Sequence, residues 1–137
     1  MKSVSDLPGP EPSLQLRLEA LPESMPVLRD QLRGWLKDAG ATDRELFEIQ
    51  LAVTEAFANA VEHPEEPTSH LVEIQGTVTN RSVAVSVRDY GRWQDELSAK
   101  QEGGLGLAIM DMLMDSVVIE PFEDGTTVTM QRQLSNH

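Results

Sequence analysis

Cysteine is absent from the 137 residues of this sequence. Neither a disulfide framework nor a thiolate zinc site can form without it, so a reducing cytoplasm is the compartment that we expect. Apolar runs are short as well: none approaches the roughly 18 residues of a membrane-spanning helix, and Met1 to Pro12 lacks the apolar stretch of a signal peptide. The sequence therefore predicts a soluble, cytoplasmic protein with no membrane partner.

Basic residues are scarce, because 11 Lys and Arg stand against 23 Asp and Glu, which gives a formal net charge of −12. Duplex affinity comes largely from Lys and Arg that neutralise phosphates, so this balance argues against direct nucleic-acid binding. A basic protein is the partner that such a charge favours, while the alternative is that the charge serves only solubility.

Aromatic residues make up only 4% of the chain, so its core must be packed from aliphatic side chains. A length of 137 residues suits one domain with one core. Three of the first twelve residues are proline, which indicates a flexible tail over 1–12 and a folded domain over 13–135.

Hydrophobic periodicity predicts the elements of that domain. Leu14, Leu16 and Leu18 alternate with polar residues, as in a half-buried strand, and Thr42 and Glu45 have the spacing of a helix capping box. In chain order we expect this strand, helices over 23–39 and from Thr42 to before Pro64, strands over 71–79 and 82–89, a short helix over 107–114, and strands over 117–122 and 126–133. Tight turns between consecutive strands require antiparallel pairing. The predicted fold class is α+β: a two-layer sandwich with a mixed, mostly antiparallel sheet covered on one face by three helices.

Two polar residues share one narrow stripe of the second helix, Glu55 and Asn59. The rest of this helix is apolar nearly all round, and polar groups on a buried helix are costly to desolvate unless they meet a partner. The pair is therefore a candidate ligand or metal site. The alternative is an ordinary exposed stripe that continues through Glu62 and His63.

A lone carboxylate, Asp89, lies where a run of alternating valines gives way to Tyr90 and Gly91. It can accept a hydrogen bond from an exocyclic amine such as that of adenine, and Gly91 lets a planar ring approach the backbone. The hydroxyl of Thr126, which follows the turn at Gly125 and faces inward, is placed to complete a base pocket. Taken alone, each of these signals is equally typical of a turn or hairpin.

A glycine-rich segment, Gly103-Gly104-Leu105-Gly106-Leu107, precedes the third predicted helix. Free amides and the positive end of a helix can receive phosphates, which is how an acidic protein binds a polyanion. The segment lacks the Lys-Ser/Thr pair of a Walker loop and does not follow a strand as a dinucleotide fingerprint does. A flexible hinge is the alternative.

Four signals follow one another in the chain: Glu55 with Asn59, Asp89 with Gly91, Gly104 with Gly106, and Gly125 with Thr126. This order resembles the N, G1, G2 and GT boxes of the superfamily of gyrase, histidine kinase and mismatch-repair ATPases. The small size, the strand before two helices and the Asn59-Ala60-x-x-His63 run more specifically resemble the anti-sigma-factor serine/threonine kinases, over about residues 14–134. The resemblance implies the Bergerat-type ATP-binding fold and the cofactors ATP and Mg²⁺.

The resemblance also implies a role for each site residue. Glu55 would be the general base toward a partner's serine or threonine hydroxyl, and Asn59 would ligate Mg²⁺ that bridges the phosphates. Asp89 would accept from the adenine amine, with Gly91 beside the ring and Thr126 supporting that end of the pocket.

The phosphates would meet the backbone from Gly103 to Leu107, with a lid over residues 90–103. Many relatives carry an arginine where this chain has Leu105, so neutralisation of the phosphates would rest more heavily on Mg²⁺. The lid is short and has only Arg92 and Lys100 as basic residues, which predicts weak nucleotide affinity or weak kinase turnover.

Proteins of this family sequester a sigma factor and phosphorylate an anti-anti-sigma (STAS-type) protein. The resemblance therefore implies these two partners, a homodimer, and a role in transcription regulation and the stress response. One alternative is a partner-sequestering module, with or without nucleotide, that transfers no phosphate. Others are a detached histidine-kinase catalytic domain, which would need a dimerisation helix with a phosphoacceptor histidine, and a structural domain without ligand.

Overall fold

The alternating leucines form strand β1 (Leu14–Glu19) in the computed structural model, which describes residues 12–62, 71–90, 104–122 and 125–135. The later strands are β2 (Leu71–Thr79), β3 (Ser82–Asp89), β4 (Ser116–Phe122) and β5 (Gly125–Gln133). They form one sheet in the order β1-β2-β3-β5-β4, and all four described pairings are antiparallel, where a mixed, mostly antiparallel sheet was expected.

Two hairpin features explain this sheet. Asn80 and Arg81 both have positive φ, 50° and 64°, as a two-residue turn between twisted strands requires, and the bounds of β2 and β3 are those predicted. β5 inserts between β3 and β4, which places Thr126 opposite Asp89. Segments far apart in the sequence therefore meet at the end of β3.

The helices are α1 (Met25–Asp38), α2 (Asp43–Glu62) and α4 (Gly104–Leu113), with a 3-10 turn, η2 (Pro22–Ser24), before α1. The predicted helix over 23–39 thus starts as a 3-10 turn, and Pro26 lies in the first turn of α1, where a missing N–H costs nothing. The capping box of α2 is confirmed by reciprocal bonds: the Thr42 amide donates to Glu45 at 2.9 Å, and the Glu45 amide donates to the Thr42 hydroxyl at 3.1 Å.

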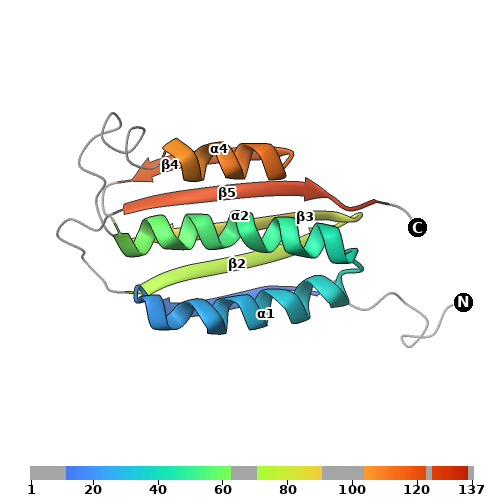
Figure 1. Ribbon diagram of the computed structural model, residues 1–137, viewed down its shortest axis with the longest axis horizontal. Coiled ribbons are helices and arrows are strands. Elements are labelled where there is room, and N and C mark those ends of the chain that lie inside the picture. Colours follow the sequence, from blue (N-terminus) through green and yellow to red (C-terminus); the bar gives the residue numbers. More distant parts are fainter. Residues whose placement is uncertain (1–11, 63–70, 91–103, 123–124, 136–137) are drawn as a thin grey trace, which may run out of the picture.

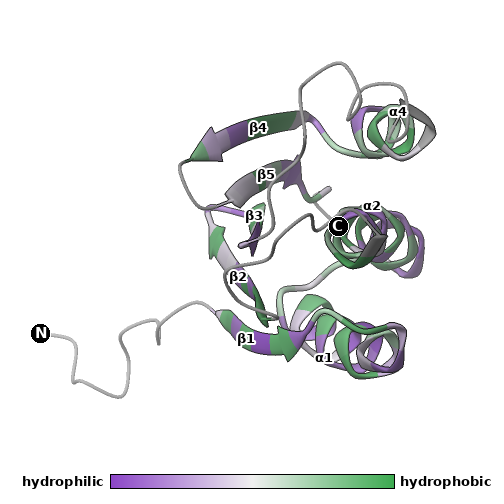
Figure 2. Ribbon diagram, turned by 90° about the vertical axis from the view of Figure 1, so that its left-hand side faces the viewer, coloured by the Kyte–Doolittle hydropathy of each residue, from purple (hydrophilic) through white to green (hydrophobic). Residues whose placement is uncertain are grey.

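All three helices pack on one face of the sheet, so the expected two-layer sandwich is confirmed (Figure 2). The core between the layers is mainly aliphatic: Val83, Val85 and Val87 of β3 are buried beneath helices that contribute Phe57 and Leu32. No helix within the described ranges combines the length and apolarity needed to cross a membrane.

One end of the molecule collects the elements that carry the predicted site residues. The C-terminal end of α2, the end of β3, the start of α4 and the start of β5 all lie at the left in Figure 1. The fold therefore brings the four sequence signals to the same end of the sandwich.

Candidate functional site

The stripe on α2 meets the start of α4. A Cβ atom placed on Gly106 would lie 3.2 Å from Oε2 of Glu55 and 3.6 Å from Nδ2 of Asn59, so these residues are in close contact. Asn59 is only 8% exposed, and its Nδ2 is buried without a hydrogen-bond partner in the described structure. Leaving a buried donor unpaired costs about 1–3 kcal/mol, which makes this amide a fitting contact for a ligand.

The glycine-rich segment, from Gly104 onward, lies inside α4. The sequence predicted a helix from Leu107, whereas α4 begins at Gly104, so Gly104, Leu105, Gly106 and Leu107 make its first turn. Glycine disfavours helix interiors, but here the absent Cβ of Gly106 lets α4 pack on α2, and packing outweighs propensity. Gly103 lies outside the described residues.

The consequence for anion binding is unchanged, because the first four amides of a helix have no acceptor within it. The amides of this turn therefore still point out of the helix end, at its positive pole. The side chain of Leu107 is half-buried against the core.

Asp89 and Thr126 form the second half of the site. They are register partners on β3 and β5, and they are 6% and 2% exposed on the face that the helices cover. A Cβ on Gly125 would lie 2.0 Å from the carbonyl oxygen of Asp89, so only glycine allows β5 to approach this closely. Gly91 lies outside the described residues.

The metal-binding capacity of this end is limited. Within the described ranges, no group of three or more His, Cys, Asp or Glu could hold a metal ion. Mg²⁺ is usually held by one or two protein groups together with substrate phosphates. The side-chain oxygen of Asn59 fits such a shared site, because it lies 3.7 Å from the Cβ position of Gly106 in the first turn of α4.

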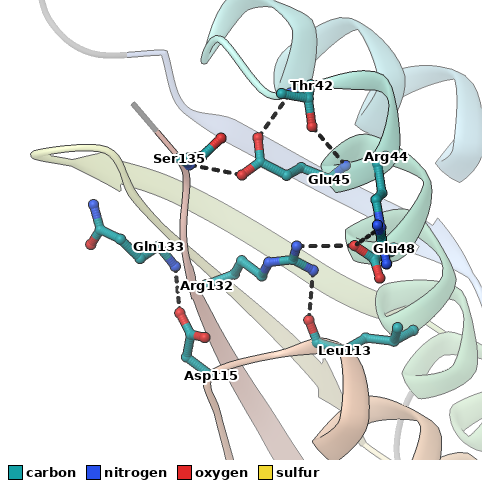
Figure 3. A network of polar contacts seen from close by, with 9 residues as sticks. All are labelled: Thr42, Arg44, Glu45, Glu48, Leu113, Asp115, Arg132, Gln133 and Ser135. Atoms are coloured by element: carbon teal, nitrogen blue, oxygen red, sulfur yellow. Dashed lines mark hydrogen bonds and ion pairs between the residues drawn. The ribbon is translucent and has the colours of Figure 1, made fainter. Parts of the chain in front are cut away.

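Sequence reasoning missed a polar network at the opposite end of the sandwich (Figure 3). Arg132 of β5 donates to Glu48 of α2 at 3.0 Å and to the carbonyl of Leu113 at the end of α4, at 2.8 Å. Eighty-four positions separate Arg132 from Glu48, so no local sequence pattern predicts this ion pair. The network ties α2, α4 and β5 together and satisfies a carbonyl at the end of α4.

A second set of hydrogen bonds beside this network involves Glu45, which accepts from the amide of Ser135 at 2.8 Å (Figure 3). Burial by itself would raise the pKa of Glu45, but the hydrogen bonds from Thr42 and Ser135 outweigh this effect and hold the pKa below its ordinary value. Only the capping-box spacing of Thr42 and Glu45 was visible in the sequence.

The fold and the site define a domain of the ATPase class: residues 18–132 match the family of the histidine kinase-like ATPase domain, and the chain belongs to this family. Its curated relatives include the serine-protein kinase RsbW of Staphylococcus aureus strain JH9, which is 27% identical over 141 aligned residues that cover 90% of this chain and 88% of the relative. The RsbW of the bovine strain RF122 / ET3-1 is 28% identical over the same shares of the two chains.

A solved relative confirms the fold. The crystal structure of the RsbU and RsbW domains of Rv1364c from Mycobacterium tuberculosis matches with a TM-score of 0.76 and 30% identity over 92% of this chain. This chain spans only 33% of that protein chain. The family resemblance expected from the sequence is confirmed by these matches.

Proposed function

We propose that this protein is an ATP-dependent serine/threonine kinase that sequesters a sigma factor and phosphorylates an anti-anti-sigma protein. The observation that carries the proposal is the meeting of Glu55, Asn59 and the first turn of α4, where the Cβ position of Gly106 lies 3.2 Å from the Glu55 carboxylate. A carboxylate, an unpaired buried amide and a helix N-terminus are the groups that positioning of a phosphoryl donor requires.

The base of ATP would lie at the ends of β3 and β5. There Asp89 accepts a hydrogen bond from the exocyclic amine, and Thr126, its register partner, supports that end of the pocket. Both side chains are buried on the helix-covered face of the sheet. The adenine would thus occupy the sheet side of the site, with Gly91 proposed beside the ring.

The backbone amides from Gly103 to Leu107 would bind the phosphates. Asn59 and the phosphates would together hold Mg²⁺. Bound Mg²⁺ supplies charge neutralisation at the phosphates. Glu55, one helical turn before Asn59, takes the proton of the partner's hydroxyl while that oxygen bonds to the γ-phosphorus and ADP leaves. No other side chain has to carry a proton.

The partners follow from the same proposal. A net charge of −12 favours a basic surface on the protein that is sequestered. We propose that the protein is cytoplasmic, because the sigma factor and its antagonist act in that compartment. Following the family resemblance, we also propose a homodimer that regulates transcription in the stress response.

The test is a phosphorylation assay with labelled ATP, Mg²⁺ and the cognate antagonist. We expect label on the antagonist with the native protein and none with Glu55→Gln, while Glu120→Gln, which changes an exposed carboxylate on β4, labels as the native protein does. A native protein that binds the sigma factor but never labels the antagonist would support the sequestering module without kinase activity. Leu105, where many relatives have arginine, is the residue that favours this second function.

A further inference from the structure

The open face of the sheet, opposite the helices, carries an interlocked cluster at the end of β3. The Tyr90 hydroxyl donates to Oε1 of Glu73 at 2.9 Å, and the Tyr90 and Phe122 rings meet edge to face with centroids 6.1 Å apart. The Arg88 guanidinium lies over both rings, 5.1 Å from the Tyr90 centroid and 4.2 Å from that of Phe122. We name Glu73, Arg88, Tyr90 and Phe122 the Tyr90 cluster.

Three strands contribute to this cluster, so it fixes their relative positions. Glu73 of β2 is the register partner of Arg88 on β3, and Arg17 of β1 lies 3.8 Å from the Glu73 carboxylate. Aromatic contacts and a cation over a ring are both favourable, so several such contacts on one segment hold it firmly.

The cluster surrounds Asp89 in the chain. Arg88 and Tyr90 are its two neighbours, and their side chains lie on the open face, whereas the Asp89 carboxylate is buried on the helix-covered face. Gly125 lies between the two rings in the sheet: it is the register partner of Phe122, and its Cβ position would fall 2.8 Å from the Cα of Tyr90. The backbone at Asp89 is therefore held by the contacts of its two neighbours, Arg88 and Tyr90, and by the close approach of Gly125 on β5.

The hydroxyl of Tyr90 remains a donor over the physiological pH range. Burial raises the pKa of Tyr90, and the hydrogen bond to Glu73 raises it further. The contact between β2 and the residue after Asp89 is therefore present wherever the protein is folded near neutral pH.

We propose that the Tyr90 cluster positions the Asp89 carboxylate and thereby sets selectivity for a base with an exocyclic amine over one with a carbonyl at the same place. This inference rests on the proposed ATP site. A carboxylate accepts from the amine of adenine but is repelled by the carbonyl oxygen of hypoxanthine, so ATP and ITP report its position, while inorganic tripolyphosphate reports only the phosphate end. Tyr90, Arg88 and Phe122 are positioning residues in this scheme.

The experiment measures the affinities of the native protein, Tyr90→Phe and Phe122→Leu for Mg-ATP, Mg-ITP and Mg-tripolyphosphate by calorimetry. We expect the ratio of ATP to ITP affinity to fall about three- to tenfold in Tyr90→Phe, the range that one hydrogen bond supplies, with tripolyphosphate affinity within about twofold of native. Ser116→Ala and Phe47→Leu are matched controls: they remove a hydroxyl and a ring that lie on exposed residues elsewhere, and they should leave the ratio unchanged.

An ATP to ITP ratio within about twofold of native in both cluster variants would overturn the inference, even if Asp89→Ala abolishes the selectivity. An equal loss for ATP, ITP and tripolyphosphate would also overturn it, because the cluster would then serve only stability. If the native protein binds ATP no better than ITP, or Asp89→Ala binds both as the native protein does, the proposed adenine site itself fails.

Discussion

Replacing Gly106 by alanine separates the stability of α4 from the chemistry of the site. The new Cβ would lie 3.2 Å from Oε2 of Glu55, closer than most Cβ contacts, so this carboxylate must shift by a few tenths of an ångström; Nδ2 of Asn59, at 3.6 Å, would be in ordinary contact. In the absence of ligand the helix gains up to about 1 kcal/mol from the exchange of glycine for alanine. The free variant should therefore unfold at a temperature equal to or above that of the native protein.

Function should change in the opposite direction. A misplacement of about 1 Å in a catalytic group can cost roughly 100-fold in rate, so a displacement of a few tenths of an ångström at Glu55 predicts a loss of about tenfold in phosphoryl transfer. The added methyl group also narrows the space at the proposed phosphate end. We therefore expect the rise in melting temperature on addition of Mg-ATP to shrink in Gly106→Ala, measured by thermal unfolding with and without nucleotide.

Gly34→Ala is the matched control, because a Cβ at Gly34 of α1 would meet no atom within 4 Å. It should gain similar helix stability and retain the native response to Mg-ATP and the native labelling rate. Native nucleotide binding and native kinase activity in a folded Gly106→Ala would refute the reasoning, since the contact with Glu55 and Asn59 would then have no part in the site.

Three further predictions concern the support of the fold. Gly125→Ala should lower the free energy of unfolding in urea by about 1–3 kcal/mol, because its Cβ would lie 2.0 Å from the Asp89 carbonyl oxygen; native stability would contradict this close approach. The pKa of Glu45 is depressed in the folded state, so the stability that its carboxylate contributes is present above the unfolded pKa, near 4.5, and is lost as the pH falls through the folded pKa. Glu45→Gln should therefore reduce the loss of unfolding free energy at acid pH. An unchanged acid dependence would contradict this role of Glu45. Arg132→Ala should lower the free energy of unfolding by about 1.5–3 kcal/mol, whereas Arg44→Ala, whose native side chain is 87% exposed, should lower it by less than about 0.5 kcal/mol. Equal losses in chemical denaturation would contradict a stabilising role for the bonds from Arg132 to Glu48 and Leu113.

Local patterns were sufficient for most of the fold. The bounds of β2 and β3 followed from the two-residue turn that they flank and from the alternating valines of β3, and the cap at Thr42 followed from the glutamate three positions later. Each of these signals involves neighbours in the chain. The start of α4 was predicted three residues too late, because glycine propensity alone cannot show that α4 packs against α2 at Gly106.

The candidate site was predictable in its parts but not in its assembly. The helical period placed Glu55 and Asn59 one turn apart, yet their contact with Gly106 depends on how α4 packs. The pairing of Asp89 with Thr126 depends on β5 entering the sheet beside β3, which no turn specifies; only the order of the motifs in related proteins suggested it. The Tyr90 cluster spans three strands, and its register was equally invisible.

The affinity of the folded protein for Mg-ATP, compared between the native chain and Asp89→Asn, tests the central claim most directly. Circular dichroism and thermal unfolding establish that both are folded. A charge-assisted hydrogen bond contributes about 1.5–3 kcal/mol, so we predict that the variant binds Mg-ATP roughly 10- to 150-fold more weakly and that its affinity for Mg-tripolyphosphate is unchanged. Equal affinity of the two proteins for Mg-ATP would contradict the assignment of this end of the sheet as a nucleotide site.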